Sequence, residues 1–359
     1  MRHHVQVPAP VDLAPLTAPP APAAVAAWRE RAERDPALAA ALAAGKGGQR
    51  GCALVWALVG SVGGMLLGVI LLLSSAPWGV GVFFLLLSAG VLVWVVILPR
   101  RSHGTPWERW ARLDAFARRN GFSFSPADPV PPQYQGLLFQ VGTEREIEEH
   151  VVSRDDGDFV DMGTVRYVGG TTDMRVVYRW GFVAIHLDRR LPQMMLDARA
   201  NDTIAASTRI PIGYARDQIL HLEGDWDRHF TLYCPAEYGT DALYIFTPDL
   251  MALFIDELAA PGTGVFDAEI ADDWLFVYAP RGFRLDDPRL MARLLRIVDV
   301  VGAKTRARAA RYVDDRVASA AANMVAPGGR RLRRRWPIAL ILLSLVLVVW
   351  RIASAIAHF

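Results

Sequence analysis

Apolar residues are concentrated in three long runs, and a mixed pattern typical of a folded domain lies between the second and the third. Residues 53–73 and 78–98 carry no charged side chain over 21 positions each. A helix needs about 20 apolar residues to cross the roughly 30 Å hydrocarbon core of a bilayer. The third run, residues 338–350, reaches that length only if it continues to residue 357. The pattern therefore predicts an N-terminal transmembrane hairpin and one C-terminal transmembrane segment.

Basic residues flank these runs and predict their orientation. They precede the first run, follow the second and precede the third: Lys46, Arg50, Arg100, Arg101, Arg330, Arg331, Arg333, Arg334 and Arg335. Only two of the 39 basic residues of the chain are lysine, a composition that favours a bacterial source. Because basic residues favour the cytoplasmic side, the pattern predicts a multi-pass protein of the bacterial inner membrane, with lipid as a partner and its main domain in the cytoplasm. Arg351 interrupts the third run, and it either extends to the outer interface or pairs with the hairpin.

Three glycines on the first apolar run repeat with a spacing of four residues. Gly60, Gly64 and Gly68 lie on one helix face, where small residues let another backbone come close. The spacing favours packing within the hairpin, and a contact between two copies of the chain is the alternative.

The remaining sequence divides into a lead, a hinge and a domain. Residues 1–22 are rich in proline and alanine and are predicted to be disordered. Residues 23–51 form an alanine-rich helical segment followed by a glycine-rich hinge. Residues 102–329 form the predicted cytoplasmic domain, which lies between the hairpin of residues 52–101 and the C-terminal region of residues 330–359.

Within the domain, the pattern predicts strands first and helices later, which is typical of an α+β fold. A helix is predicted over 106–120, with proline at its first position and glycine after its end, and a proline-rich connector over 127–135. Strands are predicted over 137–141, 151–153, 159–168, 174–180, 182–187, 230–234 and 242–246. Residues 247–258 are predicted to be a helix, residues 266–278 a hairpin, and residues 287–321 a long helix.

Charge and cysteine content exclude several classes of protein. The whole chain has a formal net charge of +2, but residues 102–286 hold 17 basic and 29 acidic residues. An acidic body argues against nucleic acid as a partner, because phosphates require a basic surface. With only two cysteines, the sequence excludes a disulfide scaffold and a four-cysteine zinc site.

One dense group of polar residues is a candidate for chemistry. His221, Glu223, Asp225, Asp227 and His229 alternate along the chain, and on one strand face they would converge as ligands for Zn²⁺ or Mn²⁺. The glycine between Glu223 and Asp225 favours a turn instead, with the polar side chains in solvent. Asp155, Asp156, Asp158 and Asp161 lack the spacing of a calcium loop. No nucleotide motif is present, so no cofactor is predicted.

The same region resembles a known family. Residues 222–257, LEGDWDRHFTLYCPAEYGTDALYIFTPDLMALFIDE, are similar to an uncharacterised family of bacterial membrane proteins. Those proteins have a transmembrane hairpin before a cytoplasmic domain that bears an L-E-G-D-aromatic motif and a later F-T-P-D/E-L-M helix start. The resemblance implies this architecture, but it assigns no activity and no catalytic residue.

The predicted function is that of a binding, scaffold or regulatory module that presents an acidic domain to a protein partner. The missing catalytic motifs favour this interpretation over an enzyme. The alternative is a membrane-tethered, metal-dependent hydrolase that uses the cluster from His221 to His229.

Overall fold

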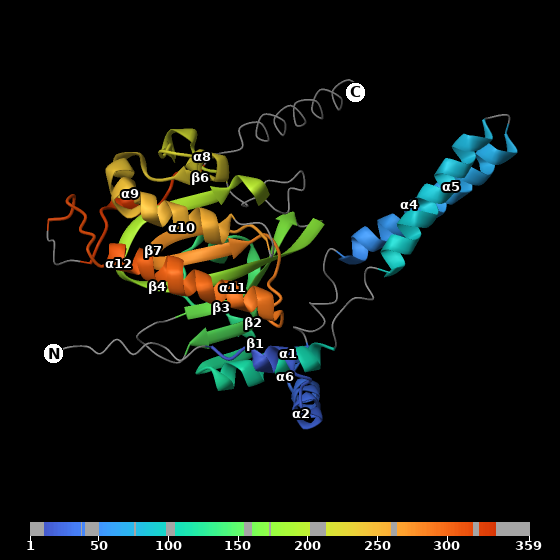
Figure 1. Cartoon of the computed structure of the whole chain (residues 1–359), viewed down its shortest axis with the longest axis horizontal. Coiled ribbons are helices and arrows are strands. Elements are labelled where there is room, and N and C mark those ends of the chain that lie inside the picture. The colour runs from blue at the N-terminus through green and yellow to red at the C-terminus, as the bar shows by residue number, and fades with distance from the viewer. Residues whose placement is uncertain are drawn as a thin grey trace, which may run out of the picture.

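An antiparallel sheet of seven strands forms the centre of the main body (Figure 1). The computed structural model describes residues 11–36, 38–39, 50–74, 77–97, 105–153, 160–171, 174–201, 213–259, 264–318 and 323–334. The strands are β1 (Phe122–Pro129), β2 (Thr143–Ser153), β3 (Val160–Thr171), β4 (Met174–Ala198), β5 (Ile219–Leu220), β6 (Phe230–Tyr233) and β7 (Asp267–Ala279). They follow the order β1-β2-β3-β4-β6-β5, and β7 also pairs with β4.

Strand β4 joins the sheet together because it has neighbours on both sides. Its first half pairs with β3 up to Ile185, and its last residues pair with β6 from Met195 to Ala198. On its other side it pairs with β7 from Gly181 to Leu196, with register shifts around Leu191. Every one of these pairings is antiparallel.

The sheet is buried on both faces, so neighbouring residues of its central strands enter different cores. Val183 and Ile185 belong to the larger apolar cluster, whereas Phe182 and Ala184 belong to a second cluster on the opposite face. Helices α10 (Pro248–Leu258) and α11 (Pro288–Ile297) contribute to the larger cluster and lie across the sheet in Figure 1. The short helix α7 (Leu137–Gln140) contributes to the second cluster.

The remaining helices are short, apart from four that precede β1 in the chain. These are α2 (Pro22–Arg34) and α6 (Pro106–Arg119) in the body, and the pair described below. The short helices are α1 (Ala14–Thr17), α8 (Trp226–His229), α9 (Gly239–Ile245), α12 (Ala303–Ala309) and α13 (Pro327–Arg330), and Val298–Gly302 forms a π-helical turn. Helix α6 starts as predicted, because Thr105 and Glu108 form a capping box around Pro106.

Several predicted elements are wrong. Residues 137–141 and 242–246 were expected as strands, but α7 and α9 are helices. In α9 the buried positions, Ala242 and Ile245, are three residues apart, which fits a helical period. The predicted hairpin over 266–278 is the single strand β7, in which Asp272 has a φ of 55° and pairs with Leu191 between two register shifts.

The predicted helix over 287–321 is also wrong, because its helical part ends at Ala309. Directly beyond Ala309, tertiary contacts hold the chain in a non-helical conformation. Tyr312 is buried and its hydroxyl donates to Asp241, while the guanidinium of Arg316 pairs with Asp241 and Asp314.

The lead predicted to be disordered is ordered from residue 11 onward. Leu16 on α1 is only 4% exposed and packs in the larger core. Asn120, at the end of α6, accepts a hydrogen bond from the backbone N–H of Asp12 and donates one to its carbonyl. Burial of one leucine and this paired contact hold a segment whose composition alone favours disorder.

The two uncharged runs form helices α4 (Arg50–Leu73) and α5 (Trp78–Ile97), which pack against each other apart from the sheet in Figure 1. A Cβ added at Gly64 would lie 2.3 Å from the Ser88 hydroxyl, and one at Gly68 would lie 2.9 Å from Leu85. These glycines therefore permit the close approach of α5. A Cβ added at Gly60 would have no atom of α5 within 4 Å.

The prediction that this pair crosses a membrane is wrong. Across the part of the chain that the structure describes, every helix is too short or too polar to span a bilayer. The predicted multi-pass inner-membrane location, which depended on these spans, is wrong for the same reason.

Other membrane-related predictions lie outside the described residues. These are the third span over 338–357 with Arg351, and the flanking residues Lys46, Arg100, Arg101 and Arg335. Arg50 begins α4, and its side chain is not described.

We expect Leu16→Ala to lower the free energy of unfolding by about 2–4 kcal/mol, because it leaves a cavity in the larger core. Val11→Ala is the matched control: Val11 is 38% exposed, so its loss should cost no more than about 0.5 kcal/mol. Urea denaturation of the two variants measures both values. Equal effects would contradict the assignment of the lead to the fold.

Candidate functional site: a charged groove above a buried histidine

The predicted polar cluster does not converge on one point. Residues 223–225 form a turn with Gly224 at φ of 77°, and α8 follows directly, so the alternation of a strand is absent. His221 Nδ1 lies 2.7 Å from an Asp227 oxygen, and His229 Nε2 lies 3.5 Å from an Asp225 oxygen. The cluster therefore consists of two separate surface pairs, and Glu223 belongs to neither of them.

Among the described residues, no group of three or more His, Cys, Asp or Glu side chains is arranged so that it could hold a metal ion. Asp155, Asp156 and Asp158 lie outside these residues, while Asp161 is buried in β3. Cys234 is buried, and burial raises the pKa of its thiol to about 11, which disfavours the nucleophilic thiolate. The hydrolase alternative thus has no geometric support in this part of the chain.

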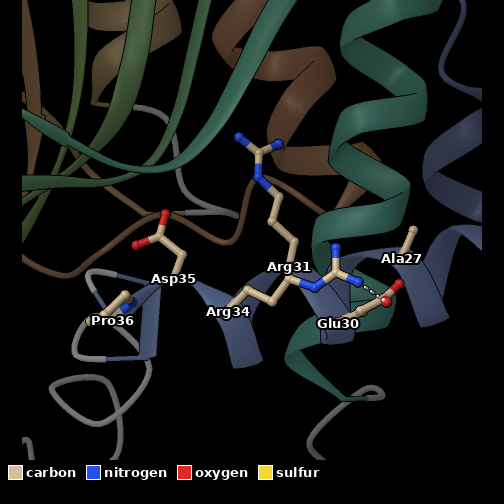
Figure 2. Close-up of a pocket in the computed structure, with 6 residues that line it drawn as sticks. All are labelled: Ala27, Glu30, Arg31, Arg34, Asp35 and Pro36. Atoms are coloured by element: carbon tan, nitrogen blue, oxygen red, sulfur yellow. Dashed lines mark hydrogen bonds and ion pairs between the residues drawn. The ribbon is translucent and has the colours of Figure 1, made fainter.

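Charged side chains converge instead in a cavity of about 620 Å³ between α2 and the first three strands. We call it the charged groove. Arg31 on α2 and Asp35, which directly follows α2, line one side of it. The other charged residues of the lining lie on β1, β2 and β3, and they are Asp128, Glu144, Arg145, Glu146 and Arg166. Figure 2 shows the adjoining hollow on α2, where Arg34 bonds Glu30 while Arg31 extends toward the strands.

A buried polar chain begins at the groove and runs into the sheet. His150 on β2 donates from Nδ1 to Asp128 and from Nε2 to Asp161, both at 2.6 Å. The Tyr134 hydroxyl donates to the second oxygen of Asp161 at 2.5 Å. Asp128 lines the groove, whereas Asp161 is 1% exposed, so the chain connects the cavity with the second core.

The two carboxylates keep His150 protonated. Burial alone would lower its pKa, but the hydrogen bonds and charges of Asp128 and Asp161 outweigh it and raise the pKa to about 9. Burial acts to raise the pKa of Asp128, and its bonds from His150 and Ser125 overcome this and lower it. Both ring nitrogens of His150 donate, so the imidazolium has no lone pair with which to act as a base.

Other buried charges in the described residues are also tied to the fold. Burial raises the pKa of Glu269, whose oxygens accept bonds from the Leu137 N–H, the Gln193 amide and the Tyr278 hydroxyl. Burial likewise raises the pKa of Glu149, which pairs with Arg109 from α6. These groups connect elements far apart in the sequence.

His150, Asp128 and Tyr134 were not among the candidate residues predicted from the sequence. Asp128 and Tyr134 lie in the stretch predicted to be a proline-rich connector, although β1 includes its first part. One signal was available: Asp161 stands between Val160 and Met162 in a predicted strand, and a carboxylate among core residues requires a partner.

Comparisons with known proteins add little to this picture. No family model matches the chain, and no curated protein matches it. The crystal structure of the mycobacterial trehalose monomycolate transport factor A, TtfA, is similar at a TM-score of 0.37 and 13% identity, covering 55% of this chain and 94% of that one. A TM-score this low does not establish a common fold. The resemblance to a bacterial membrane protein family stays a prediction.

We expect the contribution of His150 to stability to depend on pH. Its pKa rises from 6.5 in the unfolded chain to about 9 on folding, so its stabilisation is complete below the first value and is lost as pH rises through the second. The difference in unfolding free energy between wild type and His150→Gln should shrink by about 3 kcal/mol between about pH 6 and about pH 9.5.

Urea denaturation across this pH range measures the difference. His221→Gln is the matched control, because the His221 side chain is 73% exposed and its pair with Asp227 is screened by solvent. A His150→Gln effect that stays constant over the range would contradict a charged, doubly bonded imidazolium.

Proposed function

We propose that this chain is a binding module whose charged groove takes an acidic segment of a protein partner. The observation that carries the proposal is the balance of charge in the groove. Arg31 and Arg145 both line it, and neither has a carboxylate partner within the described ranges. Guanidinium groups bind carboxylates through two parallel hydrogen bonds, so an acidic peptide is their natural ligand.

Three carboxylates of the groove are already compensated. Glu144 pairs with Arg175, Glu146 pairs with Arg166 at 2.7 Å, and Asp128 pairs with His150. Asp35 is a fourth carboxylate of the lining, and the positive charge available to a ligand beside it is that of the two arginines. The Arg31 guanidinium also lies 5.2 Å from the centre of the Trp28 ring, which restricts its motion and lowers the entropy lost on binding.

An interaction role also fits the state of the titratable groups described above. The buried histidine has no free ring nitrogen, and the exposed histidines form separate pairs. The groove combines charges of both signs on a rim between two elements, an arrangement suited to selecting a partner by charge pattern.

The test uses the full chain and a fluorescein-labelled hexaglutamate peptide, with fluorescence anisotropy as the measurement. Arg31→Glu combined with Arg145→Glu should weaken binding at least about 10-fold, because two attractive charges become repulsive. Raising the salt concentration should weaken wild-type binding as well.

Arg118→Glu is the matched control, because Arg118 lies on α6, outside the groove, and pairs with Asp114. It should change the affinity less than about 2-fold. Equal effects of the groove and control variants, or preferential binding of a hexalysine peptide, would rule the proposal out.

A further inference from the structure

The arginine-rich segment that was expected to flank a membrane span lies on the domain as an extended chain. Residues 331–334 follow α13, and Arg334 forms an isolated antiparallel bridge with Tyr214. The backbone N–H of Ala215 donates to the Arg333 carbonyl at 3.0 Å. The segment thus pairs with residues 214 and 215 much as a short strand would.

Gln218 recognises the backbone of this segment. Its side-chain oxygen accepts from the Arg333 N–H at 2.8 Å, and its amide nitrogen donates to the Arg333 carbonyl at 2.9 Å. Gln218 is 2% exposed, so both bonds are shielded from water. A side-chain amide that satisfies both backbone groups of one residue imitates a neighbouring strand.

A second buried glutamine holds the preceding residue. The Gln193 oxygen accepts from the Leu332 N–H at 2.8 Å, and the Gln193 amide donates to Glu269 at 2.6 Å. Glu269 is fully buried and accepts two further bonds, which fix its position and so that of Gln193. Gln193, Gln218 and Glu269 thus form a cradle for the segment, in which Gln193 is also held by a group outside the segment.

The side chains of the segment supply the rest of the contact. Leu332 is 6% exposed and packs in the second apolar cluster with Trp274. On either side of it, Arg331 pairs with Asp272 at 3.0 Å, and Arg333 pairs with Asp217. The contact thus consists of one apolar anchor, two flanking acid–base pairs and bonds to an extended backbone, which are the features of strand-addition peptide recognition.

We propose that this cradle is a peptide-recognition site for an extended Arg-Leu-Arg segment, and that residues 331–333 occupy it as a strap that a partner of the same chemistry displaces. The Gln193 and Gln218 bonds require an extended backbone, the apolar cluster selects an aliphatic residue, and Asp217 and Asp272 select flanking arginines. This surface is formed by other residues than the charged groove, so the two sites are independent.

Covalent linkage favours the strap over any free peptide. A tethered segment acts at an effective concentration in the millimolar range, so a partner binds well only where the strap is weakened or the partner is itself held close. The affinity of a free peptide should therefore rise when the strap is released.

The experiment uses full-length chains and a fluorescein-labelled peptide with the sequence of residues 327–336, followed by fluorescence anisotropy. Leu332→Asn in the chain removes the apolar anchor without a change of charge and should release the strap. We expect the peptide to bind this variant at least about 10-fold more tightly than wild type.

Two matched changes separate recognition from general attraction between a basic peptide and an acidic domain. A peptide with asparagine in place of its leucine keeps the same charge and should bind neither chain. Adding Gln218→Leu to the Leu332→Asn chain removes the backbone clamp without altering charge, and it should abolish the gain.

A milder variant covers the case in which Leu332→Asn prevents folding. Arg331→Ala combined with Arg333→Ala removes two exposed ion pairs and leaves Leu332 in place, so the fold should persist. It should raise the affinity for the peptide about 3-fold or more. Unchanged affinity in the folded variants, or equal binding of the leucine and asparagine peptides, would overturn the proposal.

Discussion

The pairing of β4 on both of its edges is the constraint on which the rest of the body depends. A strand of 25 residues meets β3 and β6 on one edge and β7 on the other, and both of its faces are buried. A shift of its register by one residue would exchange the side chains of the two cores. Gly181 shows how close the packing is, because a Cβ there would lie 2.5 Å from the Phe283 ring.

Burial of both faces of the sheet also explains why several charged side chains lie inside the protein. Loops that cover the second face must satisfy their polar groups without water, and buried side chains do this for them. Glu269 receives the N–H of Leu137 at the start of α7, and Gln193 receives that of Leu332. His150 joins β1 to β3 across β2. The same polar groups that complete the fold thus also contribute to the groove, through Asp128, and to the cradle, through Gln193.

The two proposed recognition surfaces carry opposite charges. The charged groove offers Arg31 and Arg145, whereas the cradle offers Asp217 and Asp272. An acidic domain can therefore present a local basic site, because Arg166 on β3 and Arg175 on β4 neutralise the carboxylates of Glu146 and Glu144. Net charge alone describes neither surface.

The sequence by itself determined the elements whose signals are local. Proline at the first position and glycine after the end placed α6, and proline at the first position placed α10, because these features act within a few residues of a helix terminus. The strand β6 and much of β3 followed from the apolar pattern of their residues.

Only the tertiary structure decided the continuity of β4 and β7, the helical state of α7 and α9, the end of the helix at Ala309 and the position of the arginine segment. Each depends on a partner distant in sequence: Phe283 against Gly181, Asp241 for Tyr312, Gln218 for Arg333. The acid–base partners of His150 lie 22 and 11 residues away along the chain. Such pairings arise from sheet register and long-range packing, and neither can be predicted from a local sequence pattern.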